Sequence, residues 1–464
     1  MEKLNNKRFK SSTFINGEEN RKYYIETFGC QMNEFDSERV SYCLEGLKYS
    51  RTYDAKLADI IVLNTCAVRE KAKNRLYGHI GSLKRIKIEN PDVLICIGGC
   101  VAQNLKEKIL DDFPYVDIVF GTQNIEKLPE LINQRLNFKK SICNTFENSD
   151  SLEKLYFFKR DLKFKAFLPV MIGCNNFCSY CIVPYVRGRE RSIKPHQIIS
   201  TIKRLVDDGV IEVTLLGQNV NSYGKDLNLS EERKHYNFAE LLSNVSAVKG
   251  LRRIRFMTSH PKDFNEDIVS VIKENSNIMK HIHLPLQAGS NKILKLMNRK
   301  YTRETFTEKY NYIKNQIPDC TVTTDIIVGF PGEEERDFYE TLDMVNSLRF
   351  HRAFTFIYSK RHGAAAAKLD DFVPKEEKKL WFRKLVDLQN KISYEENLKL
   401  LGKKLEVLVE GYSMKNLGQF VGRLENNTIV NFDGFKKDAN LTGRLVNVEI
   451  KDAKVFYLIG KLEK

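Results

Sequence analysis

The sequence lacks any apolar run long enough to cross a membrane. None of its stretches approaches the roughly 18 consecutive apolar residues that a spanning helix needs. The first residues, Met1–Phe14, are charged and polar, so a secretory signal is also absent, as are internal repeats and extended low-complexity tracts. We therefore expect a cytoplasmic protein without a membrane partner, in a reducing compartment where cysteines remain thiols or bind metal.

Cysteine is too sparse to form a disulfide scaffold, because the 464 residues include only ten. That number suffices for metal or redox chemistry. A composition of 42% hydrophobic and 29% charged residues excludes a mostly disordered chain. The 75 Lys and Arg residues exceed the 60 Asp and Glu residues, giving a net charge of +15. This balance favours a polyanionic partner, nucleic acid first, with a merely soluble basic protein as the alternative.

The first part of the chain alternates short β-rich runs with helical stretches, which is typical of parallel βαβ units. We predict a doubly wound α/β domain that ends near residue 140 and is followed by a polar linker at Asn144–Glu153. Its predicted strands are Tyr23–Thr27, Ile60–Asn64, Val93–Ile97 and Val116–Phe120. Its predicted helices are Asp36–Leu47, Arg69–Lys87 and Leu105–Leu110.

A second β/α series predicts a partial barrel of six units, short of the eight in a closed TIM barrel. Its predicted strands are Ala166–Ile172, Glu212–Gly217, Arg253–Met257, His281–Leu286, Thr323–Val328 and Ala353–Tyr358. Helices are expected at Pro195–Asp208, Phe238–Val245 and Glu333–Ser347, and a long charged helix at Lys375–Leu401. From residue 402 onward, alternating apolar residues and turn signals indicate a small all-β barrel.

Three cysteines lie close together, directly after the strand Ala166–Ile172. Cys174, Cys178 and Cys181 have the spacing C-x3-C-x2-C, which lets one loop direct three sulfurs at one iron–sulfur cluster. A zinc site normally needs four protein ligands, and the next histidine, His196, lies on a predicted helix. Three ligands on a four-iron cluster leave one iron open to a substrate.

Three further cysteines each follow the end of a predicted parallel strand: Cys30, Cys66 and Cys100. Because the carboxyl ends of neighbouring parallel strands meet in one crevice, we expect these sulfurs to converge on a second cluster. Buried apolar thiols are the alternative. Cys43, Cys96, Cys143 and Cys320 are interpreted as core or incidental thiols.

Polar residues also follow strands of the predicted barrel, on the face where such folds place active sites. These are Gln218 and Asn219, Ser259-His260-Pro261, and the turn Gly329-Phe330-Pro331-Gly332-Glu333, whose backbone amides could hold an anionic group. His281 and His283 share a strand face and are expected to be hydrogen-bonded structural groups. The arginines of Arg187-Gly188-Arg189-Glu190-Arg191 could grip phosphates or carboxylates, with a solvated loop as the alternative.

From about Tyr23 to the C-terminus, the chain resembles the methylthiotransferase family of radical S-adenosylmethionine (SAM) enzymes. The amino-terminal motifs that carry the resemblance are Thr27–Asn33 with Asp36-Ser37-Glu38, Asn64–Glu70 and Gly98–Gln103. The central motifs are Gly173–Cys181, Tyr185–Glu190, Met297-Asn298-Arg299 and Gly329–Glu333. Gln31-Met32-Asn33 favours the branch that acts on N6-dimethylallyladenosine in tRNA over siblings that modify threonylcarbamoyladenosine or a ribosomal protein.

The resemblance implies three domains: a methylthiotransferase amino-terminal domain (22–140), a radical SAM core (155–396) and an RNA-binding TRAM domain (399–464). It implies two [4Fe-4S] clusters, one on Cys174, Cys178 and Cys181 that chelates SAM, and one on Cys30, Cys66 and Cys100 that carries the sulfur. Reductive cleavage of SAM would give the radical that takes hydrogen from adenine C2, and a second SAM would donate the methyl group. The residues expected to contact SAM are Tyr180, Gln218, Asn219, Gly329, Gly332 and Glu333.

The resemblance also implies tRNA as partner, a flavodoxin- or ferredoxin-like electron donor and a monomer. A non-catalytic iron–sulfur RNA-binding protein is the alternative from another functional class. Two departures from the family pattern leave local loop shape and substrate fit open: Ala288 stands where a serine is common, and Arg361-His362-Gly363-Ala364–Ala367 replaces an Arg-Pro-Gly-Thr-Pro-Ala-Ala run.

Overall fold

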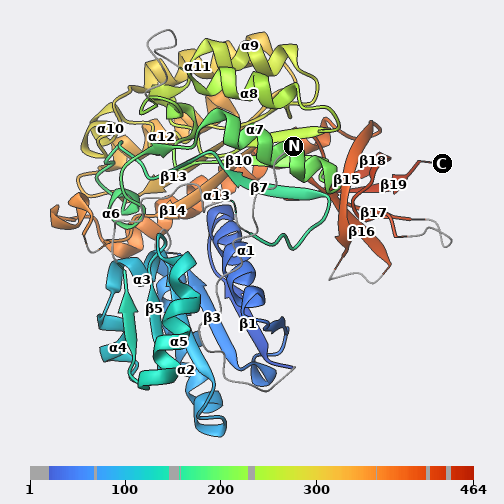
Figure 1. The fold of residues 1–464 in the computed structure, drawn as a ribbon. Helices are drawn as coiled ribbons and strands as arrows, with labels where there is room; N and C mark the ends of the chain where they lie inside the picture. The colour runs from blue at the N-terminus through green and yellow to red at the C-terminus, as the bar shows by residue number, and fades with distance from the viewer. Residues whose placement is uncertain are drawn as a thin grey trace.

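The structure is a computed structural model. It describes residues 20–66, 70–145, 156, 158–227, 236–361, 363–413, 418–434 and 440–463. The polar residues Met1–Phe14 and most of the expected linker Asn144–Glu153 lie outside these residues. Figure 1 shows three parts in chain order: a blue-to-teal amino-terminal domain, a larger green-to-orange core and a red C-terminal barrel.

The amino-terminal domain is built on a parallel six-stranded sheet with the order β2-β1-β3-β4-β5-β6. Its strands are β1 (Lys22–Thr27), β2 (Ser50–Arg51), β3 (Ile60–Thr65), β4 (Leu94–Gly99), β5 (Ile118–Phe120) and β6 (Ile142–Asn144). Its helices are α1 (Gln31–Gly46), α2 (Glu70–Glu89), α3 (Cys100–Leu105), α4 (Lys108–Asp112) and α5 (Leu128–Phe138). Apolar residues form two separate core clusters in this domain, which confirms the doubly wound prediction.

The sheet is wider than the sequence indicates. The four predicted strands are present, but β2 and β6 add both edges, and β6 continues the sheet past residue 140. The prediction of a single helix at Leu105–Leu110 is wrong, because α3 ends at Leu105 and α4 begins at Lys108. The two edge strands have only two and three residues, so they carry no readable alternation.

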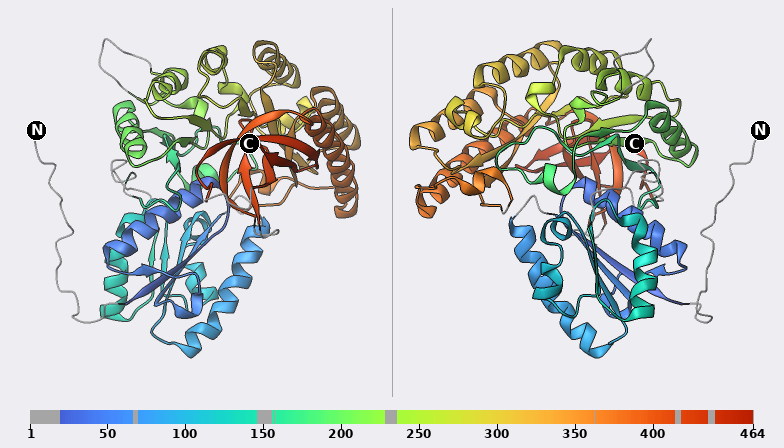
Figure 2. Two further views of the ribbon diagram at one scale, coloured as in Figure 1. Left: turned by 90° about the vertical axis from the view of Figure 1, so that its right-hand side faces the viewer. Right: turned by 60° about the vertical axis from the view of Figure 1, so that its left-hand side comes forward.

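The core contains six parallel strands in two groups, β7-β10-β11 and β12-β13-β14, joined by a bridge between Ile254 and Ile278. The strands are β7 (Lys165–Pro169), β10 (Glu212–Leu216), β11 (Arg253–Phe256), β12 (His281–His283), β13 (Thr321–Val328) and β14 (Arg352–Ile357). Helices cover the outside of this open barrel, as Figure 2 shows: α7 (Pro195–Asp207), α8 (Phe238–Ser246), α9 (Glu266–Glu274), α10 (Asn291–Leu296), α11 (Arg303–Gln316) and α12 (Glu335–Leu348). This confirms the predicted partial (β/α)6 barrel.

A long helix, α13 (Lys375–Leu398), leads from the core to the C-terminal domain. That domain is a closed barrel with the strand order β15-β16-β17-β19-β18, as predicted. Its strands are β15 (Lys404–Tyr412), β16 (Gln419–Arg423), β17 (Ile429–Asp433), β18 (Leu445–Ala453) and β19 (Tyr457–Leu462).

The C-terminal barrel docks against the amino-terminal ends of the core strands. Arg253, the first residue of β11, donates hydrogen bonds to the carbonyls of Arg423 and Glu406, each at 3.0 Å. His351 and Thr428 form a further buried contact at 3.0 Å. The opposite, carboxyl ends of the core strands are therefore left to face the amino-terminal domain.

None of the helices in the described part of the chain is both long enough and apolar enough to cross a membrane.

Candidate active site

The loop with the C-x3-C-x2-C cysteines begins in a tight turn after β8 (Met171–Ile172). Gly173 has φ +77°, and a Cβ at this position would lie 2.0 Å from the carbonyl oxygen of Arg189. The next backbone amide, of Cys174, donates to the carbonyl of Gly188 at 3.1 Å. Only glycine fits here, and the turn clamps the start of the loop against the segment that follows it.

The rest of the loop is held by the motif Met297-Asn298-Arg299. Asn298 donates to the carbonyl of Phe177 at 2.9 Å, and Arg299 Nη1 lies 3.3 Å from Cys178 Sγ. From the other side, the amide of Ala366 donates to the carbonyl of Ser179 at 2.7 Å. The motif Met297-Asn298-Arg299 and the alanine-rich segment that includes Ala366 therefore both fix the shape of the cysteine loop.

The three sulfurs of this loop are largely shielded from solvent. Cys174 and Cys178 are buried and Cys181 is half-buried. Burial raises the pKa of Cys174 to about 12 and that of Cys181 to about 11. A bound metal cluster supplies the positive charge that converts such thiols to thiolates, so the donor set suits a cluster.

Cys30, Cys66 and Cys100 lie where the sequence predicts, at the carboxyl ends of β1, β3 and β4. A Cβ built on Gly29 would lie 2.4 Å from Cys66 Cβ, so this glycine lets the two cysteines approach each other. A hydrogen bond between the Cys30 and Cys66 thiols lowers the pKa of Cys30 to about 6, with help from the charge of Arg187. Burial raises the pKa of Cys100.

Among the described residues, no three His, Cys, Asp or Glu side chains lie close enough to bind one metal ion. An iron–sulfur cluster holds its thiolates farther apart than a single ion does, because several irons and sulfides lie between them. Thiolates are the usual ligands of such clusters, so the residue types of both cysteine groups suit one.

The other motif residues of the amino-terminal domain form a buried network behind this second group. Asn33 donates to the carbonyl of Thr65 at 2.9 Å, and Asn64 donates to the carbonyl of Asn33 at 2.7 Å. Asn64 also donates to Ser37 Oγ at 2.9 Å, and Thr65 Oγ1 donates to the carbonyl of Gly98 at 2.6 Å. These bonds tie together the three loops that carry the cysteines.

One short segment connects the two cysteine groups. Residues 182–187, which include α6 (Val183–Val186), follow directly after Cys181. Ile182 and Val186 pack against Cys100, and Thr122 Oγ1 donates to the carbonyl of Val186 at 2.9 Å. Figure 1 shows α6 next to α3, the helix that begins at Cys100. The two candidate cluster sites therefore share a wall.

Unpartnered polar atoms gather at the carboxyl ends of the core strands. In the part of the chain that the structure describes, the following are buried without a hydrogen-bond partner: Gln218 Oε1 and Asn219 Oδ1 after β10, Ser259 Oγ and His260 Nε2 after β11, Glu333 Oε1 after β13 and Tyr358 OH after β14. Buried polar atoms are normally satisfied, so these atoms are available to hydrogen-bond a polar ligand. SAM, with its amino acid and ribose groups, suits such a lining.

The turn Gly329–Glu333 is organised by its own last residue. Glu333 Oε2 accepts hydrogen bonds from the amides of Gly329 and Phe330, and burial raises the pKa of this carboxyl to about 7. Gly329 and Gly332 have φ values of +70° and +85°. Lys378 of α13 donates to the carbonyl of Gly329 at 2.7 Å. The backbone amides of this turn were expected to hold an anionic group. Two of them, those of Gly329 and Phe330, donate to Glu333 instead.

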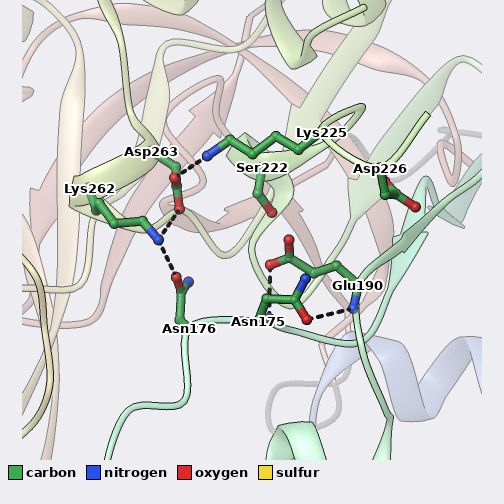
Figure 3. A pocket seen from close by; sticks show the side chains of 8 residues that line it. All are labelled: Asn175, Asn176, Glu190, Ser222, Lys225, Asp226, Lys262 and Asp263. Carbon is green, nitrogen blue, oxygen red and sulfur yellow. Dashed lines mark hydrogen bonds and ion pairs between the residues drawn. The ribbon is translucent and has the colours of Figure 1, made fainter. Parts of the chain in front are cut away.

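A polar pocket of about 210 Å³ opens beside the cysteine loop (Figure 3). Asp263 forms its hub, because it accepts hydrogen bonds from Lys225 at 2.5 Å and from Asn219 at 2.7 Å. Lys262 donates to Asn176 Oδ1 at 2.8 Å, which ties this wall to the loop. The remaining lining residues are Asn175, Glu190, Ser222 and Asp226.

The structure gives several of the predicted residues partners that the sequence did not indicate. Tyr180 accepts a hydrogen bond from Arg299 at 3.4 Å. Arg187 is buried against the amino-terminal domain rather than exposed to a cofactor phosphate, and it donates to Asp36 Oδ2 at 2.8 Å. His281 and His283 both contact Thr323 Oγ1 at 3.0 Å, as expected of structural groups.

Sequence reasoning missed two residues that support the site. Arg299 belongs to a motif of the family resemblance, but its contact with Cys178 spans 121 residues of sequence and has no local signal. Lys378 lies in a helix rich in lysine, and nothing local distinguishes it from its neighbours.

Comparisons with known proteins agree with this architecture. The uncharacterized protein family UPF0004 matches residues 22–121, the radical SAM superfamily matches 168–345 and the TRAM domain matches 398–462. A tRNA-2-methylthio-N(6)-dimethylallyladenosine synthase from Thermoanaerobacter pseudethanolicus is 47% identical over 442 residues, covering 95% of this chain and 92% of the relative. The chain belongs to this family of synthases. It is therefore a transferase of the radical SAM methylthiotransferase type, which confirms the resemblance drawn from the motifs.

Further relatives of the same name come from Acetivibrio thermocellus and Clostridium tetani. The first is 46% identical over 442 residues, covering 95% of this chain and 90% of the relative. The second is 46% identical over 451 residues, covering 96% of this chain and 98% of the relative. Membership of the radical SAM superfamily implies one [4Fe-4S] cluster and SAM as cofactors of this synthase.

Two solved structures share the fold at low identity. The radical SAM methyltransferase TsrM from Kitasatospora setae has a TM-score of 0.51 at 12% identity, over 73% of this chain and 75% of that one. The cobalamin-dependent radical SAM enzyme OxsB has a TM-score of 0.51 at 13% identity, over 81% of this chain and 56% of that one. These likenesses concern the fold alone.

Proposed function

We propose that this enzyme inserts a methylthio group at C2 of N6-dimethylallyladenosine, next to the anticodon of tRNA. The observation that carries the proposal is the shared wall, residues 182–187, between two groups of three cysteines in two domains. Insertion of sulfur at an unactivated C–H position needs both a radical source and a sulfur source close together. The identity of 46–47% to synthases of this name supports the substrate, as does Gln31-Met32-Asn33.

In this proposal, Cys174, Cys178 and Cys181 hold the [4Fe-4S] cluster with SAM, and Cys30, Cys66 and Cys100 hold a second one. When bound, the cluster on Cys174, Cys178 and Cys181 would supply the electron that cleaves SAM. The cluster on Cys30, Cys66 and Cys100 would supply the sulfur. The protein contributes position: Arg299 and Gly173 fix the first loop, and the Asn33–Asn64 network fixes the second. Ile182 and Val186 exclude water from the wall between them.

SAM would lie against the unpartnered polar atoms of Gln218, Asn219 and Glu333, with Gly329 and Gly332 shaping the turn beside it. Tyr180 would line the same space from the cysteine loop. This placement agrees with the carboxyl-end rule for barrel enzymes. It also leaves the polar pocket around Asp263 as a neighbour of the SAM site.

The tRNA partner is supported by the TRAM domain and by the net charge of +15. The target adenosine belongs to a loop, where an unstacked base can enter a protein pocket.

We place the domain limits at 22–140, 155–396 and 399–464. We further propose a monomer that works in the cytoplasm with its tRNA and receives electrons from a flavodoxin- or ferredoxin-like donor.

Mass spectrometry of tRNA nucleosides tests the substrate. A strain that lacks this gene and any paralogue should accumulate N6-dimethylallyladenosine without its methylthio product, and the cloned gene should restore that product. Persistence of the product would refute the assignment. If the strain keeps the methylthio form of N6-dimethylallyladenosine but loses the methylthio form of threonylcarbamoyladenosine, the result would favour the sibling enzyme instead.

Iron content tests the cofactors. Anaerobic reconstitution should load about eight irons per chain if both clusters have four. Replacing Cys30, Cys66 and Cys100 by alanine should leave about four irons and keep reductive SAM cleavage, while methylthiolation is lost. An intact chain that binds only one cluster's iron would contradict the two-cluster proposal, and absent SAM cleavage would favour the non-catalytic alternative.

A further inference from the structure

Arg187 is a buried arginine that crosses from the radical SAM core into the amino-terminal domain. It follows α6 directly, in the wall between the two cysteine groups. Its own backbone carbonyl accepts a hydrogen bond from Gln123 at 3.4 Å, and the preceding carbonyl accepts from Thr122 at 2.9 Å. The peptide that carries the guanidinium is therefore pinned to the amino-terminal domain, which limits where its charge can lie.

One side of the guanidinium faces a carboxylate. Arg187 Nη2 donates to Asp36 Oδ2 at 2.8 Å, and both side chains are buried. Asp36 also lies 3.8 Å from Arg39, which in turn contacts Glu126 at 3.2 Å. Two arginines and two acids thus alternate in a short chain. Arg187 is the member of this ion-pair network that also hydrogen-bonds a cysteine, Cys100.

The guanidinium also contacts the second cysteine group. Arg187 hydrogen-bonds the Cys100 side chain, and its charge acts on both Cys100 and Cys30. An arginine side chain stays protonated in proteins, and the Asp36 carboxylate lies 2.8 Å from this one as its counter-charge. The cation is therefore permanent, and its position beside the sulfurs comes from the other domain.

We propose that Arg187 is a positioning residue that raises the reduction potential of the cluster on Cys30, Cys66 and Cys100, while Asp36 limits this effect. The inference rests on the proposed function, because it requires that second cluster. Reduction adds negative charge, which a nearby cation stabilises, and hydrogen bonds to cluster sulfurs act in the same direction. A nearby carboxylate opposes it. The two residues should therefore act with opposite sign, although they form one ion pair.

The test uses the full chain with Cys174, Cys178 and Cys181 replaced by alanine, so that only the second cluster remains. After anaerobic reconstitution, iron is counted, and the midpoint potential of the cluster is measured by a mediated dithionite titration followed by electron paramagnetic resonance. Arg187→Met and Asp36→Asn are then made separately in this background. Lys127→Met, an exposed lysine of the same domain, controls for the loss of one positive charge at a distance.

We expect Arg187→Met to lower the equilibrium constant for one-electron reduction at least tenfold, which is a shift of about 59 mV. Asp36→Asn should raise the same constant, and Lys127→Met should leave it unchanged. Arg187→Lys, which keeps the charge but loses the planar fork, should fall between the parent and the methionine variant. If the ion pair were merely structural, Arg187→Met and Asp36→Asn would both loosen the site. They would then not shift the midpoint potential of the cluster in opposite directions.

Two results overturn the inference, and they are distinguishable. If the triple-alanine background binds no cluster, the second cluster itself is refuted, and the inference fails with it. If the cluster is present with about four irons, but the methionine and asparagine variants shift its potential in the same direction or not at all, only the role of Arg187 is refuted.

Discussion

Arg255 and Glu212 form a buried ion pair at the base of the core barrel. Arg255 Nε donates to Glu212 Oε2 at 3.0 Å. The other two nitrogens of the same guanidinium donate to the carbonyls of Glu425 and Leu424, each at 2.8 Å. The charge of Arg255 is therefore balanced within the core, while its remaining donors hold a turn of the C-terminal barrel. One side chain thus joins the domain with the proposed RNA-binding role to the catalytic core.

Arg255→Met should loosen this junction and lower the stability of the chain. Removing one partner leaves Glu212 buried without its counter-ion, which costs about 3–5 kcal/mol. Denaturant unfolding, with trypsin cleavage between the core and β15 as a second readout, measures the effect. Glu212→Gln added to this variant should recover part of the loss, because it removes the stranded charge. Lys404→Met, which breaks the exposed pair with Glu463, should change stability by less than about 1 kcal/mol. If Arg255→Met and Lys404→Met changed stability equally, Arg255 would not be the residue that holds the junction between the two domains.

Gly173→Ala should prevent correct formation of the first cysteine loop. The added Cβ would meet a backbone oxygen, Arg189 O, which cannot rotate away, and the left-handed φ adds strain. We expect reconstituted protein to lose the iron of one cluster, about four of about eight. Iron analysis and electron paramagnetic resonance measure this.

Gly46→Ala provides the control for the glycine change. Gly46 is the last residue of α1, and a Cβ there would have nothing within 4 Å. This variant should bind iron normally and be at least as stable as the parent. A Gly173→Ala protein with full iron content would show that the loop tolerates a wider turn.

Lys378→Met should weaken SAM binding without removing iron. Lys378 is buried, and its ammonium bridges the Gly329 carbonyl and Asp371, so its loss frees the turn that Glu333 organises. A hydrogen bond from a charged group contributes about 1.5–3 kcal/mol, and we expect at least a tenfold higher Kd for SAM by equilibrium dialysis. Lys379→Met, on the exposed side of the same helix, should leave the Kd unchanged. A normal Kd in Lys378→Met would exclude the turn from the SAM site.

The sequence predicted the elements of the fold better than their junctions. Strands such as Ile60–Thr65 are continuous apolar runs, and cysteines that follow them must lie at one sheet edge in a parallel sheet, so both could be predicted from local pattern. Arg187 and Arg255 could not be assigned in the same way. Their partners, Asp36 and the carbonyl of Leu424, lie more than one hundred residues away, and only the docking of domains brings them together.

Glu38 should make the stability of the chain depend on pH near neutrality. This residue of α1 accepts a hydrogen bond from the amide of Asp161 at 3.2 Å, and its other oxygen is buried without a partner among the described residues. Burial raises the pKa of Glu38 from 4.5 to about 7, with the charges of Asp161 and Glu34 acting in the same direction and that of Arg160 against it. Folding therefore favours the protonated form. Its stabilising contribution is complete below pH 4.5 and is lost as the pH rises through about 7.

Glu38→Gln imitates the protonated carboxyl and should remove this dependence. The variant should match the parent in Tm at pH 4.5 and exceed it increasingly as the pH rises to about 7, above which the difference levels off, because only the parent must ionise a buried carboxyl. Thermal unfolding of both proteins across this range measures the difference. Glu130→Gln, an exposed acid of α5, makes the same change in charge and should give a difference that is constant with pH. A Glu38→Gln difference that is also constant, or that shrinks as the pH rises, would show that Glu38 is already ionised in the folded enzyme at pH 5.5.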